Sequence, residues 1–201
     1  MRGQRHRKPM GIFRSGGFSS RLAARLVERD EWWFDEPLAA ALARFFQGKT
    51  VGDFGAGIGR YAEFLNAHGV DCRGYDAIPG IDALTGGRVV HFDLCPASPE
   101  TLSRTFDWVL CLEVMEHIPA ELESVALANL DRLNTCGLVI SWAVPGQGGQ
   151  GHVNEQPNRH AIGWFTARGY AHDGNSQQLL RRGARIDWFK SSLMVFRRLD
   201  G

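Results

Sequence analysis

A glycine-rich loop directly after a short apolar run constrains the fold of this chain more than any other feature. Residues 51–60 read VGDFGAGIGR, so Asp53 precedes three glycines at alternate positions and a helical pattern follows. Glycine has no Cβ, so such a loop can turn sharply and approach a ligand closely. The free N–H groups of the new helix face the same place. The stretch therefore predicts a nucleotide-type pocket at the end of a β-strand.

The spacing of this loop differs from two common nucleotide-binding loops. A dinucleotide fingerprint reads G-x-G-x-x-G, and a P-loop needs Lys-Ser or Lys-Thr after its glycines. Here the spacing is D-x-G-x-G-x-G, and the only Lys-Thr pair, Lys49-Thr50, precedes the strand. A carboxylate beside the loop repels a pyrophosphate and attracts a cationic amino group. The pattern therefore favours a cofactor that carries an amino acid over NAD or ATP.

Apolar runs alternate with helical patterns along the chain, which predicts an α/β fold with a mostly parallel sheet. Strands are expected at 51–54, 70–75, 89–92, 108–112, 138–144 and 192–198. Helices are expected at 60–68, 119–133 and around 161–167, with one or two more in 19–46 and a shortened or missing one between Asp76 and Val89. Ligands of such sheets bind outside the carboxyl ends of the strands. The acidic residues expected at those ends are Asp53, Asp76, Asp93 and Glu113.

The ordered set of motifs resembles the class I S-adenosylmethionine-dependent methyltransferases, in their small-molecule branch, over roughly residues 49–198. Residues 53–59 are similar to the family's first motif, and residues 106–119 (FDWVLCLEVMEHIP) to its fourth strand and following turn. The resemblance implies a Rossmann-like, doubly wound, mostly parallel seven-stranded sheet with helices on both faces and an antiparallel last strand. It also implies transfer of a methyl group to an oxygen or nitrogen of a small-molecule acceptor.

The same resemblance implies that three carboxylates bind the polar groups of the cofactor. Asp53 would lie near the methionine amino group, Asp76 would accept hydrogen bonds from both ribose hydroxyls, and Asp93 would accept one from the adenine amine. Local structural roles are the alternatives: orienting the glycine loop, preceding a turn and capping a turn. The other implied cofactor-binding residues are Gly55, Ala56, Gly57, Ala77, Leu94 and Leu112.

Methyl transfer requires a base only when the acceptor must lose a proton, and histidine is the usual candidate near neutral pH. His152, after the fifth strand, is the first candidate, as a base or as a ligand of the acceptor. His117, in the EVMEHIP motif, is the second, with shaping of the pocket as its alternative. His91 lies in an expected strand and is assigned a structural role. No metal ligand is assigned, because the strand ends give Glu113 without a clear carboxylate triad.

Two segments are expected near the acceptor. Residues 145–152 are rich in glycine and glutamine, which is typical of a mobile loop at a pocket mouth, with a plain surface connection as the alternative. Trp32, Trp33 and Phe34 are expected to form an aromatic wall or lid, or to anchor the N-terminal helix on the core.

Charge is distributed unevenly along the 201 residues. Residues 1–27 hold seven basic and no acidic residues, whereas residues 28–201 hold 16 basic and 22 acidic ones. We expect a basic, flexible tail at 1–18 and one methyltransferase domain at 19–201, in which 19–47 form a helical cap. A nucleic-acid arm, a membrane-surface arm and an organelle-targeting segment are the alternatives for the basic stretch.

Cysteine spacing and hydropathy suggest where the protein works. The four cysteines are scattered without C-x-x-C spacing, which favours a reduced, cytoplasmic setting over a disulfide scaffold or a zinc site. No apolar run reaches the length of a membrane helix. Two other functions stay open: a nucleic-acid or protein methyltransferase that uses residues 1–27, and a non-catalytic cofactor-binding module. Against the first, neither N-P-P-Y nor D-P-P-Y follows the fourth strand.

Overall fold

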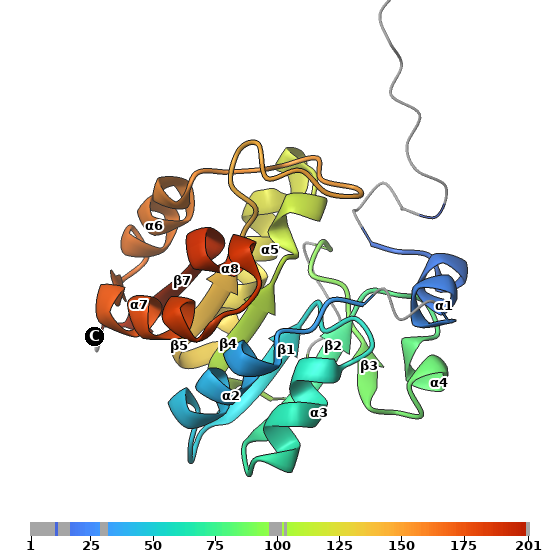
Figure 1. The fold of residues 1–201 in the computed structure, drawn as a ribbon. Coiled ribbons are helices and arrows are strands. Elements are labelled where there is room, and N and C mark those ends of the chain that lie inside the picture. Colours follow the sequence, from blue (N-terminus) through green and yellow to red (C-terminus); the bar gives the residue numbers. More distant parts are fainter. Residues whose placement is uncertain (1–10, 12–16, 29–31, 97–101, 103, 200–201) are drawn as a thin grey trace, which may run out of the picture.

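The computed structural model describes residues 11, 17–28, 32–96, 102 and 104–199, so most of the expected basic tail lies outside the described residues. Its centre is a seven-stranded sheet with the order β3-β2-β1-β4-β5-β7-β6 (Figure 1). The strands are β1 (Thr50–Phe54), β2 (Asp71–Asp76), β3 (Val89–His91), β4 (Phe106–Leu112), β5 (Asn134–Ser141), β6 (Tyr170–His172) and β7 (Leu193–Arg198). β1 to β5 pair in parallel, and β7 runs antiparallel to both β5 and β6. The predicted sheet and its antiparallel last strand are confirmed.

Helices cover both faces of this sheet, as a doubly wound fold requires. They are α1 (Ser20–Glu28), α2 (Glu36–Phe45), α3 (Arg60–Ala67), α4 (Ile81–Leu84), α5 (Ala120–Arg132), α6 (Asn158–Thr166), α7 (Gly174–Gly183) and α8 (Asp187–Ser192), with a short 3-10 helix, η1 (Met115–His117). One buried cluster joins α5 and α6 to the sheet, and a second joins α2, α3, α7 and α8 to its other face. α4 has four residues, which confirms the shortened helix expected after the second strand.

The C-terminal third differs most from expectation. β5 begins four residues earlier than predicted and ends three residues earlier, at Ser141. The residues Asn134 to Gly137 lack an apolar strand pattern, but they extend because they pair with β4. After Ser141 the chain leaves the sheet, and the Trp142 indole donates a hydrogen bond to the carbonyl of Asn154. β6, α7 and α8 were not predicted, since a three-residue strand and short polar helices give little periodic signal.

Asp35 connects the N-terminal helices to the C-terminal part of the chain. Its Oδ1 accepts a hydrogen bond from the N–H of Leu38 and caps α2, with Pro37 in the first turn. Its Oδ2 accepts from the N–H groups of Arg185 and Ile186, at 2.7 and 2.6 Å. The side chain is 2% exposed. One buried carboxylate therefore fixes the start of α2 against the segment between α7 and α8.

The carboxyl ends of β1, β2, β3 and β4 meet at one edge of the sheet. The loop that follows β5 passes above this edge (Figure 1), and the N-terminal segment before α1 also reaches it, since Gly17 and Phe18 line a cavity there. Among the described residues, no helix has the length and apolar character needed to cross a bilayer. The edge is therefore the place where residues distant in sequence come together.

Candidate cofactor and acceptor site

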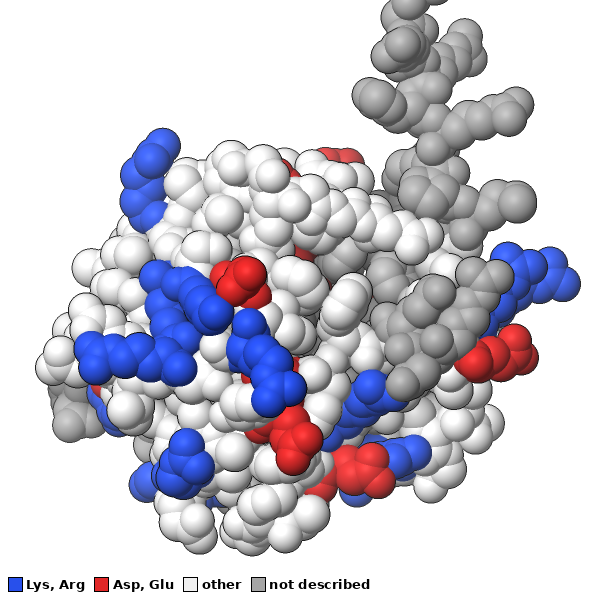
Figure 2. Space-filling model, viewed as in Figure 1, with Lys and Arg blue, Asp and Glu red and all other residues white. Residues whose placement is uncertain are grey.

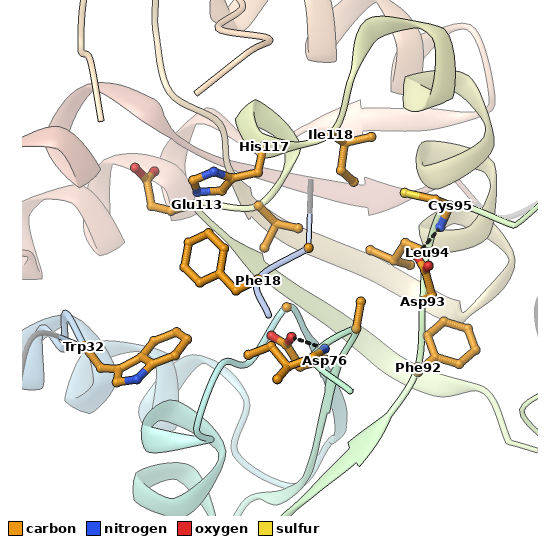
Figure 3. A pocket seen from close by; sticks show the side chains of 15 residues that line it. Phe18, Trp32, Asp76, Phe92, Asp93, Leu94, Cys95, Glu113, His117 and Ile118 are labelled. Carbon is orange, nitrogen blue, oxygen red and sulfur yellow. Dashed lines mark hydrogen bonds between the residues drawn. The ribbon is translucent and has the colours of Figure 1, made fainter. Parts of the chain in front are cut away.

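Two adjoining cavities lie over the carboxyl ends of the strands, with volumes of about 120 and 430 Å³. Five residues line both of them: Phe18, Trp32, Gly55, Glu113 and His117. The smaller cavity extends toward β2 and β3, and the larger one toward the loop after β5. The two cavities therefore form one cleft, and Figure 3 shows Phe18, Trp32, Glu113 and His117 on the wall of the smaller cavity.

The glycine loop forms the floor of this cleft. Gly55 and Gly57 have φ values of 77° and 57°, a left-handed conformation that side chains other than glycine rarely adopt. A Cβ on Gly55 would lie 2.2 Å from a methyl carbon of Val114, and one on Gly57 would lie 2.4 Å from the Trp32 ring. The N–H groups of Gly55 and Ala56 both donate to the carbonyl of Tyr75. The loop is therefore a tight turn that only glycine fits.

Asp53 is an acidic residue in an apolar setting at the end of β1. Its side chain lies on the larger cavity, and Oδ2 is buried without a hydrogen-bond partner. Burial, followed by the charge of Asp76, raises its pKa to about 7, against the lowering effect of a hydrogen bond from the Ala62 backbone. Asp53 thus orients the first turn of α3 with one oxygen and leaves the other free for a cationic group.

Asp76 ends β2 and holds the glycine loop from the other side. Its Oδ2 accepts from the N–H of Gly57 at 2.8 Å, and its Oδ1 accepts from the N–H of Ile78 at 3.0 Å. Burial raises the pKa of Asp76 to about 6, and these backbone hydrogen bonds lower it. In Figure 3 its carboxylate lies below the Phe18 ring. Each oxygen keeps a second lone pair that a ligand hydroxyl can use.

The far end of the smaller cavity is mainly apolar. Ile78, Phe92 and Leu94 line it, and all three are buried. Asp93 accepts a hydrogen bond from the N–H of Cys95 through Oδ1, at 2.8 Å. A flat aromatic group with a polar edge suits this shape, because apolar side chains contact its faces and a carboxylate reaches its rim. Ile78, which follows the end of β2 by two residues, was not among the residues predicted from the sequence.

Glu113 follows Leu112 at the end of β4 in an unusual backbone conformation. Its φ is 55°, the one positive value among the described non-glycine residues, which costs about 1 to 3 kcal/mol. Its N–H donates to the hydroxyl of Ser141, and its carboxylate accepts from Gln147 at 2.7 Å and Ser192 at 3.2 Å. The strain therefore aims this carboxylate into the cleft, where two neutral donors hold it.

His117 and His152 lie together beside the larger cavity. Their ring centroids are 5.1 Å apart and the rings are nearly perpendicular. Burial, then the neighbouring His152, lowers the pKa of His117 to about 4, so the ring is neutral at physiological pH. His152 bonds to Glu155 through Nδ1 at 3.1 Å. Two imidazole rings therefore face one point on the wall of the cleft.

Glu116 lies behind these two rings and is completely buried. Neither of its carboxyl oxygens makes a hydrogen bond of good geometry. Oε1 is 3.9 Å from Nε2 of His152. Burial and the adjacent charge of Glu113 raise the pKa of Glu116 well above its usual range, against the lowering effect of the nearby backbone N–H groups of Glu116 and Ala143. Sequence reasoning assigned this residue no role, although it precedes His117 directly and follows Glu113 by three positions.

The glycine- and glutamine-rich loop lies at the mouth of the larger cavity, as predicted. Glu155 accepts hydrogen bonds from the N–H groups of Gly146 and Gly148, both at 2.7 Å. The carbonyl of Glu116 accepts from the N–H groups of Val153 and Asn154. The end of the loop is therefore fixed to η1. The mobility of its tip stays a prediction.

Aromatic side chains from the N-terminal part close the side of the cleft. Phe18 contacts His117 edge-on, with ring centroids 5.5 Å apart, and lies 6.1 Å from Trp32. Trp33 is 74% exposed and packs against Trp188 at the rim. Phe34 instead packs on the rings of Tyr61 and Phe64. Trp32 and Trp33 thus line the larger cavity while Phe34 packs on α3, and the role of the triplet toward an acceptor stays a prediction. Phe18 adds a wall residue that the sequence placed in the tail.

The structure brings all the predicted site residues to this one cleft. The cavities are lined by Asp53, Gly55, Ala56, Gly57, Asp76, Ala77, Asp93, Leu94, Leu112, His117 and His152. His91 is exposed in β3 and lies outside both cavities.

Comparisons with known proteins agree with this architecture. CcbJ, a methyltransferase from Streptomyces caelestis, superimposes with a TM-score of 0.66 at 12% identity, over 96% of this chain and 100% of that one. A TehB-like S-adenosylmethionine-dependent methyltransferase from Corynebacterium glutamicum gives 0.63 at 18% identity, over 90% and 96%. The 1,6-didemethyltoxoflavin-N1-methyltransferase of Burkholderia thailandensis gives 0.59 at 21% identity, over 89% and 88%. At these identities the likeness shows a shared fold.

Sequence comparison gives the family. A search of curated proteins returns no match. A family model described as "Methyltransferase domain" matches residues 27–144, more than half of the chain, and includes the glycine loop, the strand-end carboxylates and the EVMEHIP turn. The predicted family is confirmed: the chain belongs to the methyltransferase domain family.

Proposed function

We propose that this chain is an S-adenosylmethionine-dependent methyltransferase that transfers a methyl group to an oxygen or nitrogen of a small molecule. The unpartnered Oδ2 of Asp53 carries the proposal, because it is buried beside the glycine loop in a residue that lines the larger cavity. A buried carboxyl oxygen without a partner needs a donor. The ammonium of an amino-acid-bearing cofactor supplies such a donor.

The remaining cofactor-binding residues fit the rest of this molecule in order along the cleft. Asp76 would hold the ribose hydroxyls, Asp93 would hold the adenine amine, and Leu94 would pack against the ring. The loop backbone of Gly55, Ala56 and Gly57, together with Ala77 and Leu112, would lie against the cofactor. When bound, S-adenosylmethionine supplies a methyl group on a positively charged sulfur. The protein then has to position the acceptor in line with that group and exclude water.

The acceptor is proposed to bind in the larger cavity, between the glycine loop and the loop after β5. A volume of about 430 Å³ suits a small molecule. Solved proteins of the same fold support this class, since the one from Burkholderia thailandensis was crystallised with 1,6-didemethyltoxoflavin and S-adenosylhomocysteine. We assign catalytic roles at this end to His152 and His117, whose rings lie on the cavity wall.

The two rival functions are less well supported. Five of the seven basic residues in 1–27 lie outside the described residues, and of the described part of the proposed tail at 1–18, Gly17 and Phe18 line the site. In Figure 2, basic side chains on the described surface are interspersed with acidic ones, and the upper part of this face is mainly uncharged. A non-catalytic module would not need the histidine pair. The proposal includes a cytoplasmic location, because the scattered cysteines favour a reduced setting.

Calorimetry tests the cofactor directly. S-adenosylmethionine and S-adenosylhomocysteine are titrated into the full chain, and each is expected to bind once per chain. Mass spectrometry then follows methylation of a panel of small hydroxyl and amino compounds. Absence of binding by both cofactor forms would contradict the proposed function. Binding without transfer to any acceptor, while RNA or protein is methylated, would support the first rival instead.

Replacement of His152 by alanine is expected to lower turnover by about a hundredfold and to change cofactor affinity little. The ring lies on the acceptor side of the cleft and does not contact the residues assigned to the cofactor. His160→Ala is the matched control, because His160 bonds to Glu123 outside the cavities. Turnover is measured with the best acceptor of the panel. Equal turnover in His152→Ala and the control would remove His152 from catalysis.

A further inference from the structure

We propose that Glu116, His117 and His152 form a site for one divalent transition-metal ion at the acceptor end of the cleft. One ligand atom from each residue lies within 4.8 Å of the others. Two imidazole nitrogens and one carboxylate oxygen suit Zn²⁺, Fe²⁺ or Co²⁺ rather than Mg²⁺ or Ca²⁺. No metal ligand was expected from the sequence, because the strand ends supply only Glu113, whereas this group comes from η1 and the distant loop.

The environment of Glu116 provides an observation independent of this spacing. The side chain is fully buried, and neither of its oxygens makes a hydrogen bond of good geometry, although the backbone N–H groups of Glu116 and Ala143 and the side chain of Glu113 lie near enough to interact with it. A buried carboxylate in that state is unfavourable unless a cation or a donor compensates it. Nε2 of His152 lies 3.9 Å from Oε1, close to the 3 to 3.5 Å that separates two ligand atoms held at about 2.1 Å from one metal. Binding would therefore require only a small movement.

Both histidine rings are oriented as metal ligands are. A carboxylate only accepts hydrogen bonds, so the contact with Glu155 puts the proton of His152 on Nδ1 and leaves Nε2 free to face Glu116. His117 has a hydrogen bond to the Gly151 backbone, while its Nδ1 is buried and makes none. Metal-ligating histidines donate their second N–H to a carboxylate or a backbone carbonyl in this way. The acceptors around the two rings therefore already form an outer shell.

The proposed ion would face the larger cavity. His117, His152 and Glu113 line that cavity. The negative charge of Glu113 interacts with the carboxyl group of Glu116. Three protein ligands leave coordination positions open, as in catalytic rather than structural metal sites. The open positions would point toward the space assigned to the acceptor, because the opposite side is filled by the buried carboxyl group of Glu116.

This inference rests on the proposed function and narrows its acceptor class to hydroxyl compounds. A divalent ion binds a hydroxyl oxygen and lowers its pKa, as it does for bound water. The acceptor hydroxyl gives its proton to solvent, and its oxygen forms the new bond to the methyl carbon. The carbon–sulfur bond breaks, and its electron pair stays on the sulfur. A neutral amine, which needs no such activation, is not the expected acceptor.

Titration of Co²⁺ into the full chain tests the site, with visible absorption and calorimetry as readouts. One ion per chain is expected, with d–d bands that report nitrogen and oxygen ligands. Glu116→Gln and His152→Ala should each weaken Co²⁺ binding at least about tenfold, and Glu155→Gln by about tenfold through the orientation of His152. His160→Ala, which leaves the cluster intact, should bind as the native chain does. Circular dichroism checks that each variant is folded.

The outcomes separate the metal site from the proposed function. No stoichiometric Co²⁺ binding to the folded native chain, or binding that Glu116→Gln and His152→Ala both leave unchanged, overturns the site. Should one variant fail to fold, the other decides, together with Glu155→Gln. Cofactor binding that persists after EDTA treatment shows that the cofactor site stands without the metal. Methylation of an amine at the same rate with and without EDTA would overturn the acceptor class.

Discussion

Replacement of Asp53 by asparagine is expected to stabilise the ligand-free chain at about pH 8 and to weaken binding of S-adenosylmethionine at the same time. Burial raises the pKa of Asp53 from 3.8 to about 7. Between these values the folded chain keeps a proton that the unfolded chain has lost, so stability falls as pH rises through this range. At pH values above this range, the folded chain carries the full free-energy cost of ionising the buried Asp53, which has an upper limit of about 4 kcal/mol. Asparagine carries no charge and avoids this cost.

Urea unfolding at about pH 8 and about pH 4 measures the effect. The gain in free energy of unfolding should be large at the higher pH and small at the lower one. Asp82→Asn is the control, because that side chain is exposed. Calorimetry on the same proteins should show cofactor affinity at least about tenfold lower in Asp53→Asn, since the ammonium loses a charged partner. A variant that is less stable than the native chain at both pH values would refute the assignment.

Native cofactor affinity should also depend on pH for the same reason. An ammonium needs the ionised carboxylate, so affinity is expected to decrease as pH falls through about 7. In Asp53→Asn this dependence should become weaker. A pH profile that is the same in both proteins would point to another group.

Replacement of Asp76 by alanine is expected to weaken cofactor binding at least about tenfold. The carboxylate can accept hydrogen bonds from two ribose hydroxyls, and it already accepts from the N–H groups of Gly57 and Ile78. The variant therefore loses the ribose contacts and one support of the glycine loop. Calorimetry with S-adenosylmethionine measures the sum of these effects.

A cofactor analogue that lacks both ribose hydroxyls separates the two effects. If the variant binds the cofactor weakly because it has lost the ribose contacts, the native chain and Asp76→Ala should bind this analogue with similar affinity. A loss as large for the analogue as for the cofactor would assign Asp76 to the loop alone. Unchanged affinity for the cofactor itself would remove the ribose assignment altogether. Thermal unfolding of both proteins reports how much the loop contributes to stability.

Sequence reasoning reached the cofactor half of the cleft because local rules place it there. A carboxylate that follows a parallel strand lies at the sheet edge whatever the rest of the chain does. Asp53 lies one residue before the end of β1, Asp76 ends β2 and Asp93 follows β3 by two residues, and all three line the cavities. The glycine spacing then fixes the turn, since positive φ at Gly55 and Gly57 is a local requirement.

The acceptor half depends on contacts between segments far apart in sequence, and no local pattern encodes them. His152 meets Glu116 only because the loop end hydrogen-bonds to the carbonyl of Glu116. Phe18 reaches the cleft from a stretch whose composition resembles a tail. Ser192 reaches Glu113 across 79 positions of sequence. Periodicity and spacing contain no information on such distances, so these residues became evident only in the assembled fold.

The buried carboxylate of Asp35 has a consequence for synthesis of the chain. It joins the start of α2 to the N–H groups of Arg185 and Ile186, about 150 positions later. The adjoining Trp32 and Trp33 form one side of the cleft. On the ribosome, the parallel strands β1 to β5 emerge well before residue 186, so this wall cannot be fixed until Arg185 and Ile186 have emerged. A nascent chain would therefore hold the parallel part of the sheet with an unfinished cleft, and competence to bind ligand would come only after these two residues.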